Sequence, residues 1–164
     1  MNEFISKIGN FCIRRIAELT GLSLIIVSII LLVSLLSYSP EDPNFIFPEN
    51  TIVKNVMGSK GSYVSDLFFQ SFGLISILIP ITYLFTGINI LISKTFLIII
   101  ENTFFIILYT FIGCLFFTAF HEKSFWLTIN GNNGFLGNLF EENFLLSLVN
   151  SNNIFFYWNK YSYF

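Results

Sequence analysis

Charged residues are scarce in this chain of 164 residues. Asp, Glu, Lys and Arg make up 11% of it, whereas about a quarter of the residues of a soluble domain are charged. A surface with so few charges does not suit water, which argues against an ordinary soluble globular domain. The formal net charge of −2 argues against direct nucleic-acid binding by this segment, because such binding needs a basic surface.

Histidine and cysteine are almost absent as well. His121 is the only histidine, and Cys12 and Cys114 are the only cysteines. The two cysteines fall before the first apolar block and inside the third, so we expect no disulfide between them. A metal site needs several ligands, so we predict neither a metal nor a cofactor.

Signatures of catalysis are missing too. The serines have no neighbouring base, and no G-x-x-x-x-G-K-[ST] phosphate-binding loop occurs. We therefore predict that this chain is not an enzyme.

Long apolar blocks dominate what is present. Hydrophobic residues make up 54% of the chain, and the mean hydropathy is +0.74. The blocks cover residues 19–37, 67–92 and 96–120, and about 20 helical residues cross a hydrocarbon core of about 30 Å. The sequence predicts an all-α integral membrane protein, a multi-span helical bundle with three full spans plus an incomplete fourth, in contact with the lipid bilayer.

The first block has an alternative interpretation. Lys7, Arg14 and Arg15 before it resemble the basic region of a cleaved signal peptide, but the apolar run is longer than usual for one and no cleavage site follows. We favour a retained span. Its serines, such as Ser34, are expected to bond back to carbonyls of their own helix.

The second and third blocks are expected to form a helical hairpin, because only residues 93–95 separate them. We expect a kink near Pro80. Glu101 lies in the first two turns of the third block and is interpreted as part of a solvated helix end. A proton relay through Glu101 is the alternative, and it has no second acid or histidine at the same depth.

The placement of lysine and arginine predicts the orientation. Basic residues mark the amino-terminal segment 1–18 and the hairpin turn, where Lys94 lies, and these sides are expected to be cytoplasmic. The loop over 38–66 is then outside. Residues 121–153 are predicted to form a second outer loop, carrying an amphipathic surface helix over 136–149 that contains Glu141 and Glu142. Residues 154–164 look like the start of a truncated fourth span.

The outer loop contains two prolines and two acids that are expected to shape it. Pro40 and Pro43 disfavour helix at the residues before them, so the first helix should end at the membrane face. Asp42 is expected to bond nearby backbone amides, and the Tyr38 hydroxyl to point toward water. Asp66, with its neighbour Ser65, is expected to cap the start of the second span.

Glycines follow in the same loop, where Gly58 and Gly61 permit a tight turn or a close helix contact. A well-terminated helix with a capped successor explains all these residues. A partner-binding loop is the alternative, because exposed loops often carry function.

A family resemblance rests on this loop. The sequence reads Ser-Tyr-Ser-Pro-Glu-Asp-Pro over 37–43, then Asn-x-x-Gly-x-x-Gly over 55–61, and later Asn-Gly-Phe-Leu-Gly over 133–137. This order resembles the amino-terminal four-helix membrane domain of the FtsK/SpoIIIE family of DNA translocases, over about residues 18–137. The positions that carry the resemblance are Tyr38, Pro40, Asp42, Pro43, Asn55, Gly58, Gly61, Asp66 and Gly73.

The resemblance implies a membrane anchor that links cell division and chromosome segregation at the septum of the bacterial inner membrane. It also implies a homo-oligomer and contacts with cell-division membrane proteins. The family's ATPase motor is absent from this sequence, which is therefore expected to be a fragment, a truncated reading frame or a stand-alone copy. The alternative function is a small multi-span transporter or channel subunit.

Overall fold

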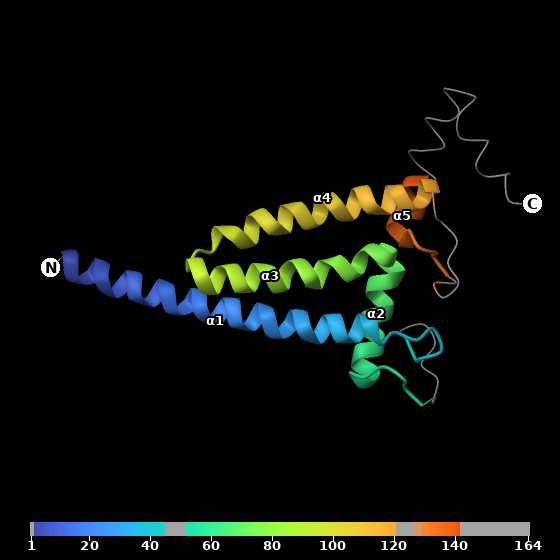
Figure 1. Cartoon of the computed structure of the whole chain (residues 1–164), viewed down its shortest axis with the longest axis horizontal. Coiled ribbons are helices and arrows are strands. Elements are labelled where there is room, and N and C mark those ends of the chain that lie inside the picture. Colours follow the sequence, from blue (N-terminus) through green and yellow to red (C-terminus); the bar gives the residue numbers. More distant parts are fainter. Residues whose placement is uncertain (1, 45–51, 121–126, 128, 142–164) are drawn as a thin grey trace, which may run out of the picture.

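The chain folds into a bundle of long helices closed at one end by short ones. The computed structural model describes residues 2–44, 52–120, 127 and 129–141, and within these ranges there is no strand. Three long helices run side by side, and a shorter one lies across their ends (Figure 1). The helices are α1 (Asn2–Leu36), α2 (Gly58–Phe72), the 3-10 helix η1 (Gly73–Ile77), α3 (Leu78–Ser93), α4 (Leu97–Phe120) and α5 (Gly134–Phe140).

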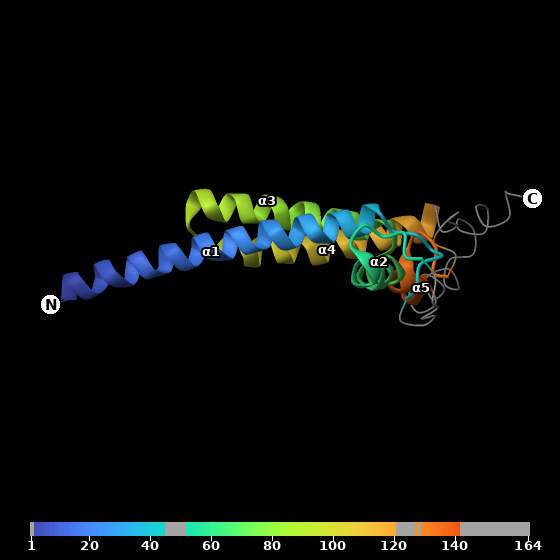
Figure 2. The same cartoon turned by 90° about the horizontal axis from the view of Figure 1, so that it is seen from below.

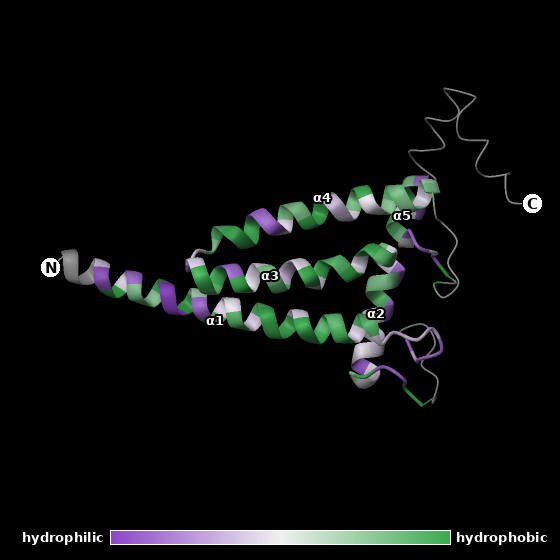
Figure 3. Ribbon diagram, in the orientation of Figure 1, coloured by the Kyte–Doolittle hydropathy of each residue, from purple (hydrophilic) through white to green (hydrophobic). Residues whose placement is uncertain are grey.

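Three helical segments are long and apolar enough to cross a membrane, namely Ser6–Leu36, Gly58–Ser93 and Leu97–Phe120. Apolar residues cover the long helices, and polar ones gather near their ends (Figure 3). Large apolar side chains such as Ile107, 65% exposed, stand on the outer surface, as expected where lipid replaces water. The predicted all-α integral membrane protein is confirmed.

The helix expected over 67–92 is divided in the structure. α2 ends at Phe72, and Gly73 takes φ 62°, ψ −147°, a conformation open to glycine, before η1 leads into α3. The kink expected near Pro80 is therefore wrong. Pro80 is the third residue of α3, in the first turn, where a missing N–H costs no helical hydrogen bond. α2 consequently lies crosswise at the end of the bundle instead of continuing α3 (Figures 1 and 2).

The first helix is longer than the apolar block that predicted it. α1 includes most of the basic segment 1–18, and this part extends beyond the turn between α3 and α4 (Figure 1). α1 packs most extensively on α3. Their backbones meet at Gly21 and Gly87, where an added Cβ would lie 2.9 Å and 2.7 Å from the carbonyl oxygen of the other glycine. Small residues at such a crossing allow close packing of membrane helices.

Hydrogen bonds join α3 to α4 in the expected hairpin. The Asn102 Nδ2 donates to the Thr86 Oγ1 at 2.8 Å, and the Thr82 and Tyr109 hydroxyls lie 3.1 Å apart. These hydrogen bonds hold the two helices of the hairpin together. Glu101, beside them in the sequence, is exposed.

α5 covers only the first part of the amphipathic helix expected over 136–149. It packs on α2 and α4. Glu141 follows directly after α5, and the rest of that helix, including Glu142, lies outside the described residues, as do His121 and the truncated span expected over 154–164.

Candidate functional site

The best-formed polar cluster lies where α1 ends and α2 begins. α1 stops at Leu36, and the next residues leave the helix because Pro40 disfavours a helical conformation at Ser39. A turn follows, in which the backbone N–H of Asp42 donates to the carbonyl oxygen of Ser39 at 3.2 Å. This turn points the Asp42 side chain back toward the start of α2.

Asp42 closes the loop with its carboxylate. Its two oxygens accept the backbone N–H groups of Lys54 and Asn55, each at 2.8 Å. The interaction joins residues 12 and 13 positions apart, whereas the sequence led us to expect amides close by in the chain. Asp42 is only 5% exposed, so the charge-assisted bonds offset the cost of burying the carboxylate.

Asn55 links this loop to both neighbouring helices. Its Nδ2 donates to the Ser34 carbonyl oxygen of α1 at 2.9 Å and to the Ser65 Oγ of α2 at 3.3 Å. Its Oδ1 accepts the backbone N–H of Met57 at 3.0 Å. All its polar side-chain atoms are thereby used, although the residue is only 4% exposed.

Serines complete the seam between α1 and α2. The Ser34 hydroxyl donates to the Gly61 carbonyl oxygen at 2.6 Å, so the expectation that it bonds back to its own helix is wrong. The Ser62 hydroxyl donates to the Pro43 carbonyl oxygen at 2.8 Å. The sequence analysis did not predict a role for Ser62. The only indication in the sequence is that Ser62 directly follows the motif glycine Gly61.

The two motif glycines act differently. Gly58 starts α2 with φ 69°, a backbone conformation that L-residues rarely adopt. Gly61 admits close contact, because an added Cβ would lie 2.4 Å from the Asn55 Oδ1. A side chain at Gly61 would therefore push the loop away from α2.

Tyr38 and Asp66 meet at the inner edge of the cluster. The Tyr38 hydroxyl donates to the Asp66 Oδ1 at 3.2 Å, and its ring packs on Phe69 with centroids 4.9 Å apart. Burial and the nearby Asp66 carboxylate raise the pKa of Tyr38 above its ordinary value. The hydroxyl thus points into the protein and not toward water, and Asp66 lies in the middle of α2, so the expected cap is wrong.

These contacts bring the motif residues into one buried arrangement, which we call the loop network. Its carboxylates and amides bind neighbouring groups of the same chain, and no cluster of metal-ligating residues occurs in the part of the chain that the structure describes. The arrangement fixes the crosswise α2 to the end of α1. The loop network consists of Ser34, Tyr38, Asp42, Asn55, Ser62 and Asp66.

Gly73 connects the loop network to α5. The Leu74 backbone N–H donates to the Asn132 carbonyl oxygen at 3.0 Å, and a Cβ on Gly73 would stand 1.9 Å from that oxygen. The Asn130 Nδ2 donates to both the carbonyl and Oε1 oxygens of Gln70, each at 3.1 Å. The Gln70 Nε2 lies 3.4 Å from the Asp66 Oδ1, so a chain of polar contacts extends from the turn before α5 to Tyr38.

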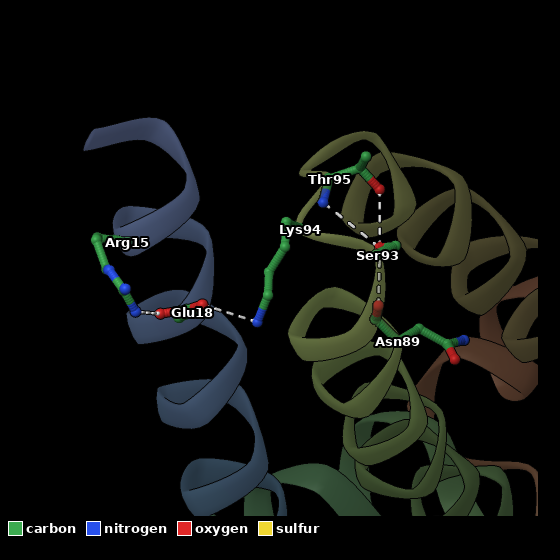
Figure 4. Close-up of polar contacts among 6 residues, drawn as sticks. All are labelled: Arg15, Glu18, Asn89, Ser93, Lys94 and Thr95. Atoms are coloured by element: carbon green, nitrogen blue, oxygen red, sulfur yellow. Dashed lines mark hydrogen bonds and ion pairs between the residues drawn. The ribbon is translucent and has the colours of Figure 1, made fainter. Parts of the chain in front are cut away.

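The opposite end of the bundle holds a smaller ion cluster. The Glu18 carboxylate of α1 accepts a hydrogen bond from Arg15 at 2.6 Å and contacts the Lys94 Nζ of the hairpin turn at 2.9 Å. Figure 4 shows the Lys94 side chain extending from the turn toward Glu18. Unlike the loop network, this cluster is open to its surroundings, since the Arg15 side chain is 60% exposed.

Comparison with known families identifies the pattern. The model of the family described as the 4TM region of DNA translocase FtsK/SpoIIIE matches residues 13–153, which include the loop network, the second and third spanning segments and most of the first. No solved structure matches the chain significantly.

Individual relatives carry the same name. The chain is 35% identical over 64 residues to the DNA translocase FtsK of Rickettsia prowazekii, a match that covers 39% of the chain and 9% of that protein. It is 29% identical over 87 residues to the DNA translocase FtsK of Azospirillum brasilense, covering 52% of the chain and 14% of that protein. The matches thus span about a tenth of the length of these relatives.

Proposed function

Because the chain belongs to the family of the 4TM region of DNA translocase FtsK/SpoIIIE, we propose that it anchors a DNA-translocating motor in the bacterial inner membrane at the division septum. The observation that carries this proposal is the family match over residues 13–153, on a structure with three helices able to span a membrane. No catalytic role is proposed for these residues. Translocation of DNA belongs to the motor that the anchor holds.

The distribution of charge supports an orientation with the amino terminus in the cytoplasm. Arg15 and Lys94 are joined through Glu18 beside the turn that follows α3, while Glu41, paired with Lys54, and Asp42 follow the end of α1. Basic residues favour the cytoplasmic side of a membrane. The loop network then faces the outside, where its rigid surface is suited to contact other cell-division membrane proteins.

The apolar outer surfaces of the long helices support a homo-oligomer. Phe104 and Phe105 of α4 are 63% and 57% exposed, and lipid or a second copy of the chain suits such a face. A motor that encircles DNA needs several anchored copies, so association of the anchors is part of the proposal.

A chimera tests the anchor. The membrane region of a full-length DNA translocase FtsK would be replaced by this chain, and the fluorescently tagged product would be located in dividing cells. We expect a band at the septum and restored chromosome segregation. Diffuse fluorescence would overturn the anchor, and uniform membrane fluorescence would overturn the septal location.

Cysteine accessibility tests the orientation. Thr95→Cys at the hairpin turn and Glu41→Cys in the outer loop would be compared in a Cys12→Ser background, with a membrane-impermeant maleimide added to intact cells. Both positions are exposed, so reagent access depends on the membrane side alone. We expect labelling at position 41 before lysis and at position 95 only after it. The reverse result would overturn the orientation.

A further inference from the structure

An open groove lies between α1 and the carboxyl end of α3, beside the ion cluster. Its volume is about 590 Å³. Charged groups stand at its outer end and leucines line the part toward the middle of the bundle. The lining residues are Arg15, Glu18, Leu19, Leu22, Leu91 and Lys94.

The basic groups of the groove retain free hydrogen-bond donors. Arg15 uses one guanidinium N–H on Glu18, and Lys94 uses one of its three ammonium hydrogens on the same carboxylate. Glu18 therefore holds the two cations on either side of itself without saturating them. With two positive charges and one negative, the groove carries a net charge of +1.

The backbone of Lys94 gives a second, independent indication of a role. Lys94 is the non-glycine residue with positive φ in the described part of the chain, at 58°, in the position after α3 where helices usually place glycine. The backbone N–H of Lys94 donates to the Ile90 carbonyl oxygen. Next to it, the Ser93 hydroxyl donates to the Asn89 carbonyl oxygen and forms a hydrogen bond with the Thr95 hydroxyl (Figure 4). A lysine held in a conformation that glycine adopts without strain suggests that its side chain has a function at this place.

The apolar half of the groove lies where acyl chains would be. Leu19 and Leu22 are 69% and 50% exposed, and they stand on the membrane side of the charged rim. At the level of Leu22, the close approach of Gly21 to Gly87 and Leu91 brings the two helices together and bounds the groove on its inner side. The site thus combines a cationic rim with an apolar slot in the order that a phospholipid requires.

We propose that this groove binds an anionic glycerophospholipid, with its phosphate between Arg15 and Lys94 and an acyl chain along the leucines. Basic pockets between membrane helices bind such headgroups. A zwitterionic lipid has a phosphate as well, but its ammonium group is repelled by the cations of the rim. The proposal rests on the groove and its charges and is independent of the anchoring role and of the orientation.

Native mass spectrometry of the full chain in detergent tests the site. Dioleoylphosphatidylglycerol and dioleoylphosphatidylcholine, which differ only in the headgroup, would be titrated and the affinity for the first bound lipid measured. We expect the anionic lipid to bind more tightly. Lys94→Gln should weaken it about five-fold, since a basic residue near anionic lipid contributes on the order of 1 kcal/mol. Arg15→Gln should act in the same direction.

Lys54→Gln is the matched control, because Lys54 is also a lysine paired with an acid, Glu41, but lies at the other end of the molecule. It should leave the affinity unchanged. Equal affinities for the two lipids in the unaltered chain, or equal losses in Lys94→Gln and Lys54→Gln, would overturn the proposal.

Two further arms separate a lipid from a free phosphate. Leu22→Ser should weaken phosphatidylglycerol binding about three-fold through lost apolar contact, while Leu108→Ser, at a similarly exposed leucine of α4, should not. Glycerol 3-phosphate in millimolar excess should fail to displace the lipid. Displacement by glycerol 3-phosphate would show that the headgroup phosphate alone is recognised and would overturn the acyl-chain slot.

Discussion

The two ends of the bundle use polar residues in opposite ways. At the loop end, Asp42, Asn55 and Asp66 are at most 6% exposed and bind groups of their own chain. At the hairpin end, Glu18 and Lys94 form an ion pair that is about one-third exposed. When a buried polar group loses its partner, the protein loses stability by the full desolvation cost of that group. When an exposed polar group loses its partner, water or a ligand replaces the partner and little stability is lost. The first end therefore holds its polar groups in fixed internal contacts, whereas the second leaves its charged groups accessible.

Gly73→Ala should produce the largest loss of stability, by disrupting the packing at the loop end of the bundle. The new Cβ would meet the Asn132 carbonyl oxygen and would also require positive φ of an alanine. We expect the free energy of unfolding in detergent to fall by about 3 kcal/mol or more. Gly9→Ala is the control, because nothing lies within 4 Å of a Cβ there. Equal stabilities of the two variants would contradict the close contact at Gly73.

Asp42→Asn should come next. The amide has one acceptor oxygen, so one of the two backbone N–H groups of Lys54 and Asn55 loses its partner and meets an amide donor instead. We expect a loss of about 2 kcal/mol in the free energy of unfolding. Glu41→Gln, one residue earlier and exposed, removes an equal charge and should change little. If both variants lost the same stability, charge and not burial would govern this end.

Tyr38→Phe should have a moderate effect that depends on pH. It removes the bond to Asp66, for an expected loss of about 1 kcal/mol at neutral pH. Because the pKa of Tyr38 is raised in the folded protein, its stabilisation is fully present below the ordinary tyrosine pKa of about 10 and is lost above it. The thermal midpoint of the unaltered chain should therefore fall more steeply above pH about 10 than that of the variant. Parallel profiles would argue against a buried hydroxyl.

Glu18→Gln should have the smallest effect. It tests whether an ion pair at the hairpin end contributes less stability than the buried contacts at the loop end. Arg15 is 60% exposed and Lys94 about one-third, so solvent replaces the lost ion pairs and the thermal midpoint in a zwitterionic detergent should not change measurably. A loss comparable to that of Asp42→Asn would show that the two ends are alike.

Some features of the molecule follow from local sequence and others do not. The spans are evident because an apolar helical segment satisfies its backbone hydrogen bonds internally. The hairpin follows in the same way from the short separation at residues 93–95. The break at Gly73 was missed because the apolar run continues through it, and Pro80, the stronger local signal, lies harmlessly in the first turn of α3.

The candidate site shows the same division. The motif residues are recognisable in the sequence, but their partners are not, since Asp42 binds amides 12 and 13 residues away and Ser34 reaches Gly61 across 27 positions. From its neighbours in the sequence alone, Asp66 resembles a helix N-cap residue. Its role in the middle of α2 depends on Tyr38, which comes from another helix.

The sequence by itself determined that this chain is helical, that it enters a membrane and to which family it belongs, because hydropathy and motif order are local properties. Only the tertiary structure decided that α2 turns across the bundle, that the loop's polar groups are buried together, and that Arg15 and Lys94 border one groove. Those outcomes depend on which surfaces meet when the helices pack, and pairs far apart in the chain leave no periodic signal in it.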